Sequence, residues 1–204
     1  HIQRSVDLEK FNIPRSEVQS PAPYIISIVG RITPLKGHSY FLKAMAKRRP
    51  VLIFIPNPNA PTGTLFPQKS LLEIIRRAPC PVVVDEAYYP FSGATLKPYL
   101  PRFPNLILLR TLSKAFSLAG LRIGYLLTGK KIAAALRGVM PPFLLGTLQE
   151  SAALTVMGRS GYVRRIVDEV KNEREDLSSR LARLPGVIPF PSKANFILFR
   201  VKNA

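Results

Sequence analysis

One lysine of this chain stands among residues that can support covalent chemistry. Lys114 follows an apolar run, residues 106–109, which predicts a buried strand. Thr111 and Ser113 lie just before it, and Arg122 lies eight residues after it. Hydroxyl groups and a guanidinium fork can hold a phosphate, while the lysine amine can condense with an aldehyde on the same ligand. The pattern therefore predicts a Schiff-base lysine for pyridoxal phosphate, against the alternative of a surface lysine that follows a core strand.

A carboxylate and a phenol follow a second apolar run in a similar way. Asp85 and Tyr88 come after residues 82–84, which are consecutive valines. A carboxylate that pairs with the pyridine nitrogen keeps the cofactor ring protonated and makes it a better electron sink. The Tyr88 hydroxyl can donate to the phenolic oxygen of the ring. Taken alone, Asp85 can also be a satisfied strand-end carboxylate, and Tyr88 an aromatic residue of the core or its rim.

The surrounding pattern predicts an α/β fold with a mainly parallel sheet flanked by helices. Apolar runs that predict strands alternate with amphipathic stretches that predict helices, the strands at 23–29, 51–55, 82–84, 106–109 and 122–127 and the helices at 69–77, 130–138 and 146–157. Parallel strands end at one edge of a sheet, where ligands bind. Asn59, Asp85 and Lys114 each follow a predicted strand, so we expect them to meet at that edge.

The C-terminal part of the chain predicts a connection to a second unit. Residues 162–184 carry apolar side chains at helical spacing on a charged background, which predicts a long amphipathic helix. Two further runs, 187–191 and 194–201, predict a strand pair. We interpret this pair as the start of a small α+β domain.

The composition predicts a globular protein that attracts anions. The 204 residues are 47% hydrophobic and carry a net charge of +18. Nucleic acid is the obvious partner for such a charge. The lysines and arginines are spread along the chain without interleaved aromatic residues, so we do not expect a nucleic-acid partner. Phosphates and other small anions would be attracted by the same charge.

We expect neither a membrane span nor a metal site. No apolar run is long enough to cross a bilayer. The only cysteine, Cys80, has no partner for an internal disulfide, which favours a reducing compartment, the cytoplasm. No leader pattern is visible at the start of the chain, so we do not expect a signal peptide. The chain begins with His1 and not with methionine, so we interpret it as a piece of a longer protein.

Residues 1–49 have a pattern of their own. A strand, a basic glycine-containing turn and a helix from Ser39 make half of a mononucleotide-binding unit, with Arg31 and Lys36 where a diphosphate can bind. The sequences VDLEKF and VGRITPLKGHSYFLKAM resemble the opening of the donor-binding domain of GT-B glycosyltransferases. That resemblance implies that Arg31 and Lys36 contact the diphosphate of a sugar nucleotide.

Residues 50–201 resemble a different family. The segments FIPNPNAPTG, VVVDEAYYPFSG, NLILLRTLSKAFSLAGLRIGY and KANFILFR occur in the order found in fold-type I pyridoxal-phosphate-dependent aminotransferases, and most closely in the histidinol-phosphate aminotransferase group. The resemblance implies the large-domain fold of these transferases in incomplete form. It also implies ping-pong amino transfer between a phosphorylated amino alcohol or amino acid and a 2-oxo acid, in histidine biosynthesis. Members are usually homodimers with sites at the subunit interface.

By the same resemblance, Lys114 is the Schiff-base lysine and later the proton shuttle. The residues implied to bind the cofactor are the ring contacts Asp85 and Tyr88, the phosphate ligands Thr111, Ser113 and Arg122, and Asn59. Relatives commonly carry asparagine immediately before the Pro-Thr-Gly sequence, but this chain has Ala60 there. Asn59 is the adjacent amide, and whether it replaces that contact stays open.

These resemblances divide the chain into four parts. They are a glycosyltransferase-like βα fragment (1–49), an aminotransferase large-domain core (50–160), a connecting helix (161–184) and the start of a small C-terminal domain (185–204). We expect the N-terminal part of an aminotransferase, and the C-terminal arginine that binds the substrate carboxylate, to be missing. The sequence therefore also leaves open an inactive truncated or fused fragment, and a sugar-nucleotide glycosyltransferase piece.

Overall fold

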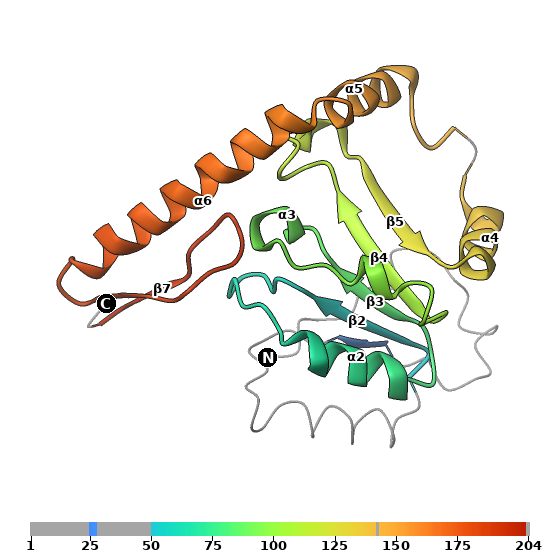
Figure 1. Cartoon of the computed structure of the whole chain (residues 1–204), viewed down its shortest axis with the longest axis horizontal. Helices are drawn as coiled ribbons and strands as arrows, with labels where there is room; N and C mark the ends of the chain where they lie inside the picture. The colour runs from blue at the N-terminus through green and yellow to red at the C-terminus, as the bar shows by residue number, and fades with distance from the viewer. Residues whose placement is uncertain (1–24, 28–49, 142, 203–204) are drawn as a thin grey trace, which may run out of the picture.

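A five-stranded sheet forms the centre of the molecule in this computed structural model, which describes residues 25–27, 50–141 and 143–202 (Figure 1). The strands follow one another across the sheet in chain order: β1 (Ile25–Ser27), β2 (Leu52–Pro56), β3 (Val82–Asp85), β4 (Leu106–Thr111) and β5 (Gly124–Thr128). The first four are parallel, and β5 runs antiparallel to β4. The predicted α/β fold with a mainly parallel sheet is confirmed.

The parallel register brings the carboxyl ends of three strands level with one another. Pro56 of β2 pairs with Asp85 of β3, and Asp85 pairs in turn with Leu109 of β4. The polar residues that follow β2, β3 and β4 must therefore emerge at the same edge. Nearly continuous apolar sequence is what strands of a parallel sheet require, because both of their faces are normally covered.

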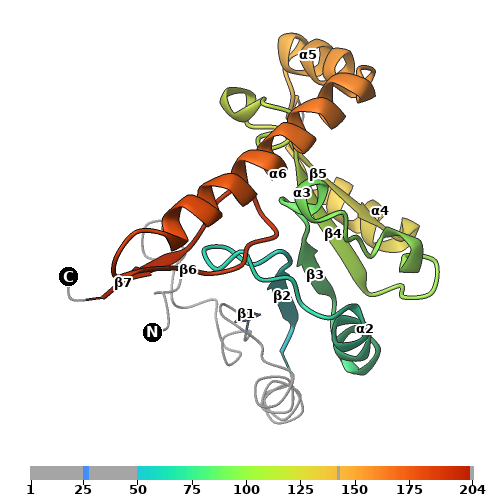
Figure 2. The ribbon, with the colours of Figure 1, turned by 60° about the vertical axis from the view of Figure 1, so that its left-hand side comes forward.

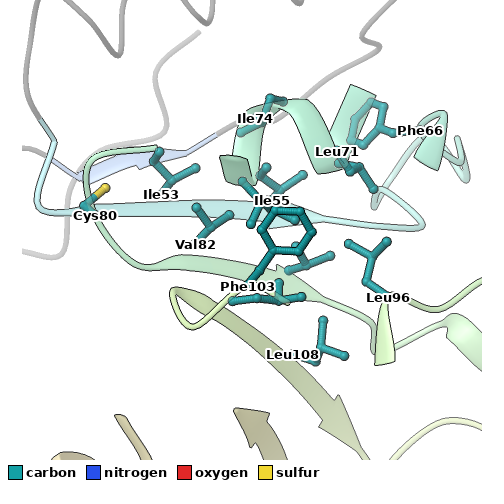
Figure 3. Packing of buried hydrophobic residues seen from close by; sticks show 13 residues of the cluster. Ile53, Ile55, Phe66, Leu71, Ile74, Cys80, Val82, Leu96, Phe103 and Leu108 are labelled. Atoms are coloured by element: carbon teal, nitrogen blue, oxygen red, sulfur yellow. The ribbon is translucent and has the colours of Figure 1, made fainter. Parts of the chain in front are cut away.

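One face of the sheet carries the main core, under helix α2 (Gln68–Arg77) (Figure 3). Alternate strand residues point toward the helix and are fully buried, namely Ile53, Ile55, Val82, Val84, Leu106 and Leu108. The helix contributes Leu71, Ile74 and Ile75. Their spacing of three and four residues gives α2 a single apolar side. Its exposed last-turn Arg76 and Arg77 suit the negative end of the helix dipole.

The remaining helices connect the sheet to a small hairpin. They are α3 (Tyr89–Ser92), α4 (Lys130–Val139), α5 (Thr147–Met157) and α6 (Ser160–Ala182). Figures 1 and 2 show that α6 starts beside α5 and ends at the two-stranded sheet of β6 (Val187–Pro189) and β7 (Phe199–Val201). Short 3-10 turns lie at Lys97–Tyr99 and Ala119–Leu121. In the described part of the chain, no helix combines the length and the apolar character needed to cross a bilayer.

Several predicted elements differ from the observed ones. The run at 122–127 forms β5 at 124–128, and its antiparallel direction is possible because residues 112–123 reverse the chain and lead back along β4 without a crossover. The predicted C-terminal strands are longer than β6 and β7, since residues 190–198 form a connection between them. The predicted helix from Ser39, with Arg31 and Lys36, lies outside the described residues. The division into four parts stays a prediction.

Candidate functional site

Polar residues from three loops gather at the carboxyl edge of the parallel strands. The Asn57 N–H donates to the Asp85 carbonyl over 2.8 Å, and the Glu86 N–H donates to the Leu109 carbonyl over 2.8 Å. These bonds extend the strand pairing by one residue beyond each strand end. They bring the loop that carries Asn59, the Asp85 end of β3 and the β4 end that leads to Lys114 to one edge.

Lys114 is exposed, and its amine lies beside the ring of Tyr88. Its Nζ is 5.7 Å from the centre of that ring. The next residue, Ala115, is buried in a small cluster with Phe91 of α3 and Val167 of α6, and Tyr88 packs against the same cluster. The turn that carries the lysine is therefore anchored in apolar packing, while the amine itself remains accessible.

Asp85 is a half-buried carboxylate without a cationic partner. Its Oδ1 accepts the Ala87 N–H over 2.9 Å, and no residue of the described ranges forms an ion pair with it. Burial raises the pKa of Asp85, the Ala87 N–H opposes this, and the neighbouring charge of Glu86 raises it further. A cation placed at this carboxylate would remove the unfavourable effect.

Asn59 is fully buried and holds an unused donor. Its Oδ1 accepts a hydrogen bond from the Thr62 hydroxyl over 2.9 Å, and its backbone N–H donates to the Thr64 carbonyl over 2.8 Å. Its Nδ2 is buried and has no hydrogen-bond partner among the described residues. An unpaired buried donor costs about 1–3 kcal/mol. The amide therefore fits an acceptor on a bound ligand.

The three predicted phosphate ligands are brought near one another by the turn after β4. The Thr111 hydroxyl donates to the Ile123 carbonyl over 3.2 Å and accepts the Ser113 N–H over 3.0 Å. The Leu112 N–H donates to the same carbonyl, so both sides of the turn meet next to Arg122. The exposed Arg122 has a left-handed backbone (φ +56°), and its Nη1 donates to the Ala119 carbonyl over 3.3 Å.

A buried ion pair was missed by the sequence analysis. Arg110 Nη2 and Nε lie 2.7 and 3.0 Å from Glu86 Oε2, and the two side chains are only 7% and 1% exposed. Glu86 directly follows Asp85, and Arg110 directly precedes Thr111. Opposite charges at the ends of two neighbouring predicted strands were the available signal.

Further hydrogen bonds and one aromatic contact surround the charged groups of the ion pair. Glu86 Oε1 accepts the Leu96 N–H over 2.7 Å, and Oε2 accepts the Thr95 hydroxyl over 2.9 Å. The guanidinium carbon of Arg110 lies 3.8 Å from the centre of the Tyr89 ring, which is a cation–π contact. Burial alone would lower the pKa of Arg110, but bonding to Glu86 raises it overall. The Arg110 guanidinium is thus charged at all ordinary pH values.

A second missed residue is Phe196, which lies between β6 and β7. Its ring meets that of Tyr88 edge to face, with centroids 5.2 Å apart. The sequence predicted a strand over this segment, and no local pattern indicates which distant side chain it contacts. The wall of the site around Tyr88 therefore includes a residue from the C-terminal part of the chain.

Comparison with known proteins identifies the family. The sequence profile of the family described as aminotransferase class I and II matches residues 38–204. The chain belongs to this family. Among its aminotransferase relatives is the histidinol-phosphate aminotransferase of Caldanaerobacter subterraneus subsp. tengcongensis, which is 44% identical over 164 residues. That alignment covers 80% of this chain and 46% of the relative, so the chain spans about half the length of the curated relatives it matches.

Solved aminotransferase structures share the fold. The histidinol-phosphate aminotransferase of Sinorhizobium meliloti, in complex with pyridoxal-5'-phosphate, gives a TM-score of 0.74 at 27% identity, covering 80% of this chain and 46% of that one. The enzyme from Clostridium acetobutylicum gives 0.76 at 24% identity, covering 82% and 52%, which supports the fold alone. The aminotransferase match begins within residues 1–49, and β1 joins the same sheet. The glycosyltransferase resemblance is therefore not supported.

The buried pair makes an asymmetric prediction for stability. Arg110→Met should lower the free energy of unfolding by about 3–5 kcal/mol, because it leaves the Glu86 carboxylate buried and unpaired. The double variant Glu86→Leu/Arg110→Met should recover most of that loss. Urea unfolding followed by circular dichroism measures both. Arg76→Met is the matched control, since Arg76 pairs with Glu73 at the surface and should cost less than about 1 kcal/mol. Equal losses for Arg110→Met and Arg76→Met would contradict this account.

The raised pKa of Asp85 predicts a pH-dependent effect on the cofactor-free chain. Because the folded pKa lies above the unfolded value, the folded state binds more protons between the two, and stability falls as pH rises through that window. Asp85→Asn should therefore be more stable than the natural chain at neutral pH. The difference should shrink as the pH is lowered toward 3.8, the ordinary pKa of an aspartate side chain. Urea midpoints measured over a pH series test this, and a constant difference would contradict it.

Proposed function

We propose that this chain carries the cofactor-binding part of a pyridoxal-phosphate-dependent aminotransferase of the histidinol-phosphate type. The observation that carries the proposal is the position of an accessible lysine amine, Lys114 Nζ, beside Tyr88 at the strand edge where Asp85 ends β3. Its 44% identity with a histidinol-phosphate aminotransferase over 164 residues supports the reaction class. The activity of a complete enzyme would need parts of the family's length that this chain does not cover.

The chemistry of the available groups fits the cofactor. Asp85 is an anion that burial disfavours and that has no cationic partner in the described chain, which suits a protonated pyridine nitrogen. Asn59 Nδ2 is a buried donor without an acceptor in the same residues, which suits an oxygen of the ligand. The exposed Arg122 and the hydroxyls of Thr111 and Ser113 suit a phosphate. Asn59 can thus supply the amide that Ala60 lacks.

Each residue then has a task that its position allows. When bound, pyridoxal phosphate supplies an electron sink that the side chains lack. Asp85 holds the ring nitrogen protonated, and the Tyr88 hydroxyl donates to the ring oxygen. Lys114 would hold the cofactor through Nζ, and once the substrate amine has replaced it there, the same nitrogen would take a proton from the substrate Cα and deliver it to the C4′ carbon of the cofactor.

The proposed substrates are a phosphorylated amino alcohol, as in histidinol phosphate, and a 2-oxo acid. A net charge of +18 favours encounter with such anions. The pathway proposed with this substrate is histidine biosynthesis. A cytoplasmic location belongs to the same proposal, since the single cysteine, Cys80, is buried and a reducing compartment suits it.

A direct test is the covalent attachment of pyridoxal phosphate. The chain should turn yellow when the cofactor is added, and borohydride reduction followed by peptide mass spectrometry should find the label on Lys114. Lys114→Ala should abolish the label while leaving the circular dichroism spectrum unchanged, because the lysine is exposed. Lys130→Ala, another exposed lysine, should label normally. Labelling that is spread over several lysines, or none at all, would instead favour a fragment without a competent site.

We also propose that the chain forms a homodimer through an exposed apolar segment, residues 139–141 and 143–148. Its exposed apolar side chains are Val139, Met140, Phe143, Leu144, Leu145 and Leu148. Contiguous apolar surface of this kind marks interaction sites on proteins, and Phe143 is 99% exposed.

The dimer can be tested through this segment. Phe143→Ser combined with Leu148→Ser should shift the chain to a monomer in sedimentation velocity, since both large side chains are removed from the proposed interface. Val51→Ser changes an exposed apolar residue elsewhere and should leave the dimer intact. A natural chain that sediments as a monomer at all accessible concentrations would exclude the proposed dimer.

A further inference from the structure

The connection between β6 and β7, residues 190–198, is fastened to the loop that carries Asn59. The Lys193 N–H donates to the Gly63 carbonyl over 2.8 Å. Gly63 has φ +68°, and a Cβ built there would lie 2.9 Å from the Cα of Ser192 and still closer to its side chain. Only glycine permits this approach. The connection therefore lies directly against the loop on this side.

A second attachment comes from helix α6. Arg174 has a side chain that is only 9% exposed, and its Nη1 donates to the Ala194 carbonyl over 2.9 Å. Ala194 is fully buried, and its N–H donates to the Ser192 hydroxyl over 3.1 Å. The connection is thus held between α6 on one side and the Asn59 loop on the other. Figures 1 and 2 show it reaching from the hairpin toward the end of the sheet.

Phe196 follows these attachments and meets Tyr88. The rings are 5.2 Å apart with an interplanar angle of 87°. The Lys114 Nζ is 5.7 Å from the centre of the same Tyr88 ring. Tyr88 also packs against the cluster of Phe91, Ala115 and Val167. The tyrosine ring is therefore enclosed by large-domain residues and by one residue from the C-terminal connection.

We infer that Phe196 is a positioning residue for Tyr88, so that the β6–β7 connection forms one wall of the cofactor site. This inference rests on the proposed function for the identity of the ligand. The χ1 rotamer of a tyrosine decides where its hydroxyl lies, because the oxygen is on the long axis of the ring. The edge-to-face contact with Phe196 holds the Tyr88 ring in one such rotamer and thereby fixes the position of its hydroxyl. The hydrogen bonds to Gly63 and from Arg174 keep Phe196 in place, because they hold Lys193 and Ala194, which come shortly before it in the connection.

The test is a double-variant cycle on the affinity of the 204-residue chain for pyridoxal phosphate. Phe196→Ala should weaken binding about 3- to 10-fold, the effect of losing one well-directed hydrogen bond. Tyr88→Phe, which removes only the hydroxyl, should weaken it by a similar factor. Because both changes remove the same bond, the combination should be no weaker than the single variants. If Phe196→Ala does not fold, Phe196→Leu replaces it in the test, because it keeps an apolar side chain. We expect its loss of affinity for pyridoxal phosphate to be intermediate.

Phe199→Ala is the matched control, because Phe199 lies in the same hairpin but is 47% exposed. It should leave the affinity unchanged. A purely structural role for Phe196 would instead give losses that multiply in the double variant. Multiplying losses, or equal losses for Phe196→Ala and Phe199→Ala, would overturn the inference.

A second readout needs no cofactor and separates the two proposals. In the ligand-free chain with labelled tyrosine, the NMR order parameter of the Tyr88 side chain should fall in Phe196→Ala and stay unchanged in Phe199→Ala. If the order parameter falls but the natural chain takes no label at Lys114, the proposed function fails while Phe196 still orders Tyr88. If the order parameter does not fall, the positioning role is overturned even when pyridoxal phosphate binds.

Discussion

The buried pair of Glu86 and Arg110 determines how the ends of β3 and β4 are held together. A buried ion pair is not in itself evidence of stability, because desolvation of both charges can exceed their attraction. Here the Arg110 guanidinium makes two hydrogen bonds to one oxygen of the Glu86 carboxylate. The Thr95 hydroxyl and the Leu96 N–H donate further hydrogen bonds to the same carboxylate. With its partners in place, the pair favours one relative position of the two strand ends. An apolar pair of similar size would not favour one relative position of the strand ends in this way, because apolar packing is not directional.

The location of the pair explains why it does not occupy the site. Side chains alternate along a strand, so Glu86 and Arg110 lie on the opposite face from Asp85 and Thr111, their immediate neighbours. The pair thus follows Val84 and Leu108 on the side that α2 covers, while Asp85 and Thr111 point to the other side. Tyr89 extends the same arrangement, since its ring stacks on Arg110 and its backbone directly follows Tyr88. The contacts among Glu86, Arg110 and Tyr89 therefore help to position the end of β3, the end of β4 and the segment that carries Tyr88.

Patterns in the sequence were sufficient for features that depend on near neighbours. The apolar runs located β2, β3 and β4, and the rule for parallel sheets brought Asp85 and the Lys114 turn to one edge. Contacts between distant residues were not available to such patterns. Glu86 and Arg110 are far apart in the chain, and their opposite charges after two predicted strands do not show that both side chains are buried against each other. Residues 190–198 have strand-like composition, yet their contacts with Gly63 and Arg174 hold them as a loop. The glycosyltransferase resemblance rested on one βα unit, which many folds share.

The unmet bonding at the site links cofactor binding to folding. In the described chain, Asp85 bears a charge that its burial disfavours, and Asn59 holds a buried donor without an acceptor. Both conditions reduce the stability of the cofactor-free chain, and a single ligand with a cationic nitrogen and an oxygen acceptor relieves both. A ligand that binds only the folded state stabilises it in proportion to its excess over Kd. The residues whose bonding is unfavourable in the cofactor-free chain are thus the same ones that would select the cofactor. The Glu86–Arg110 pair is what lets the fold keep them there, because it holds both strand ends without help from the ligand.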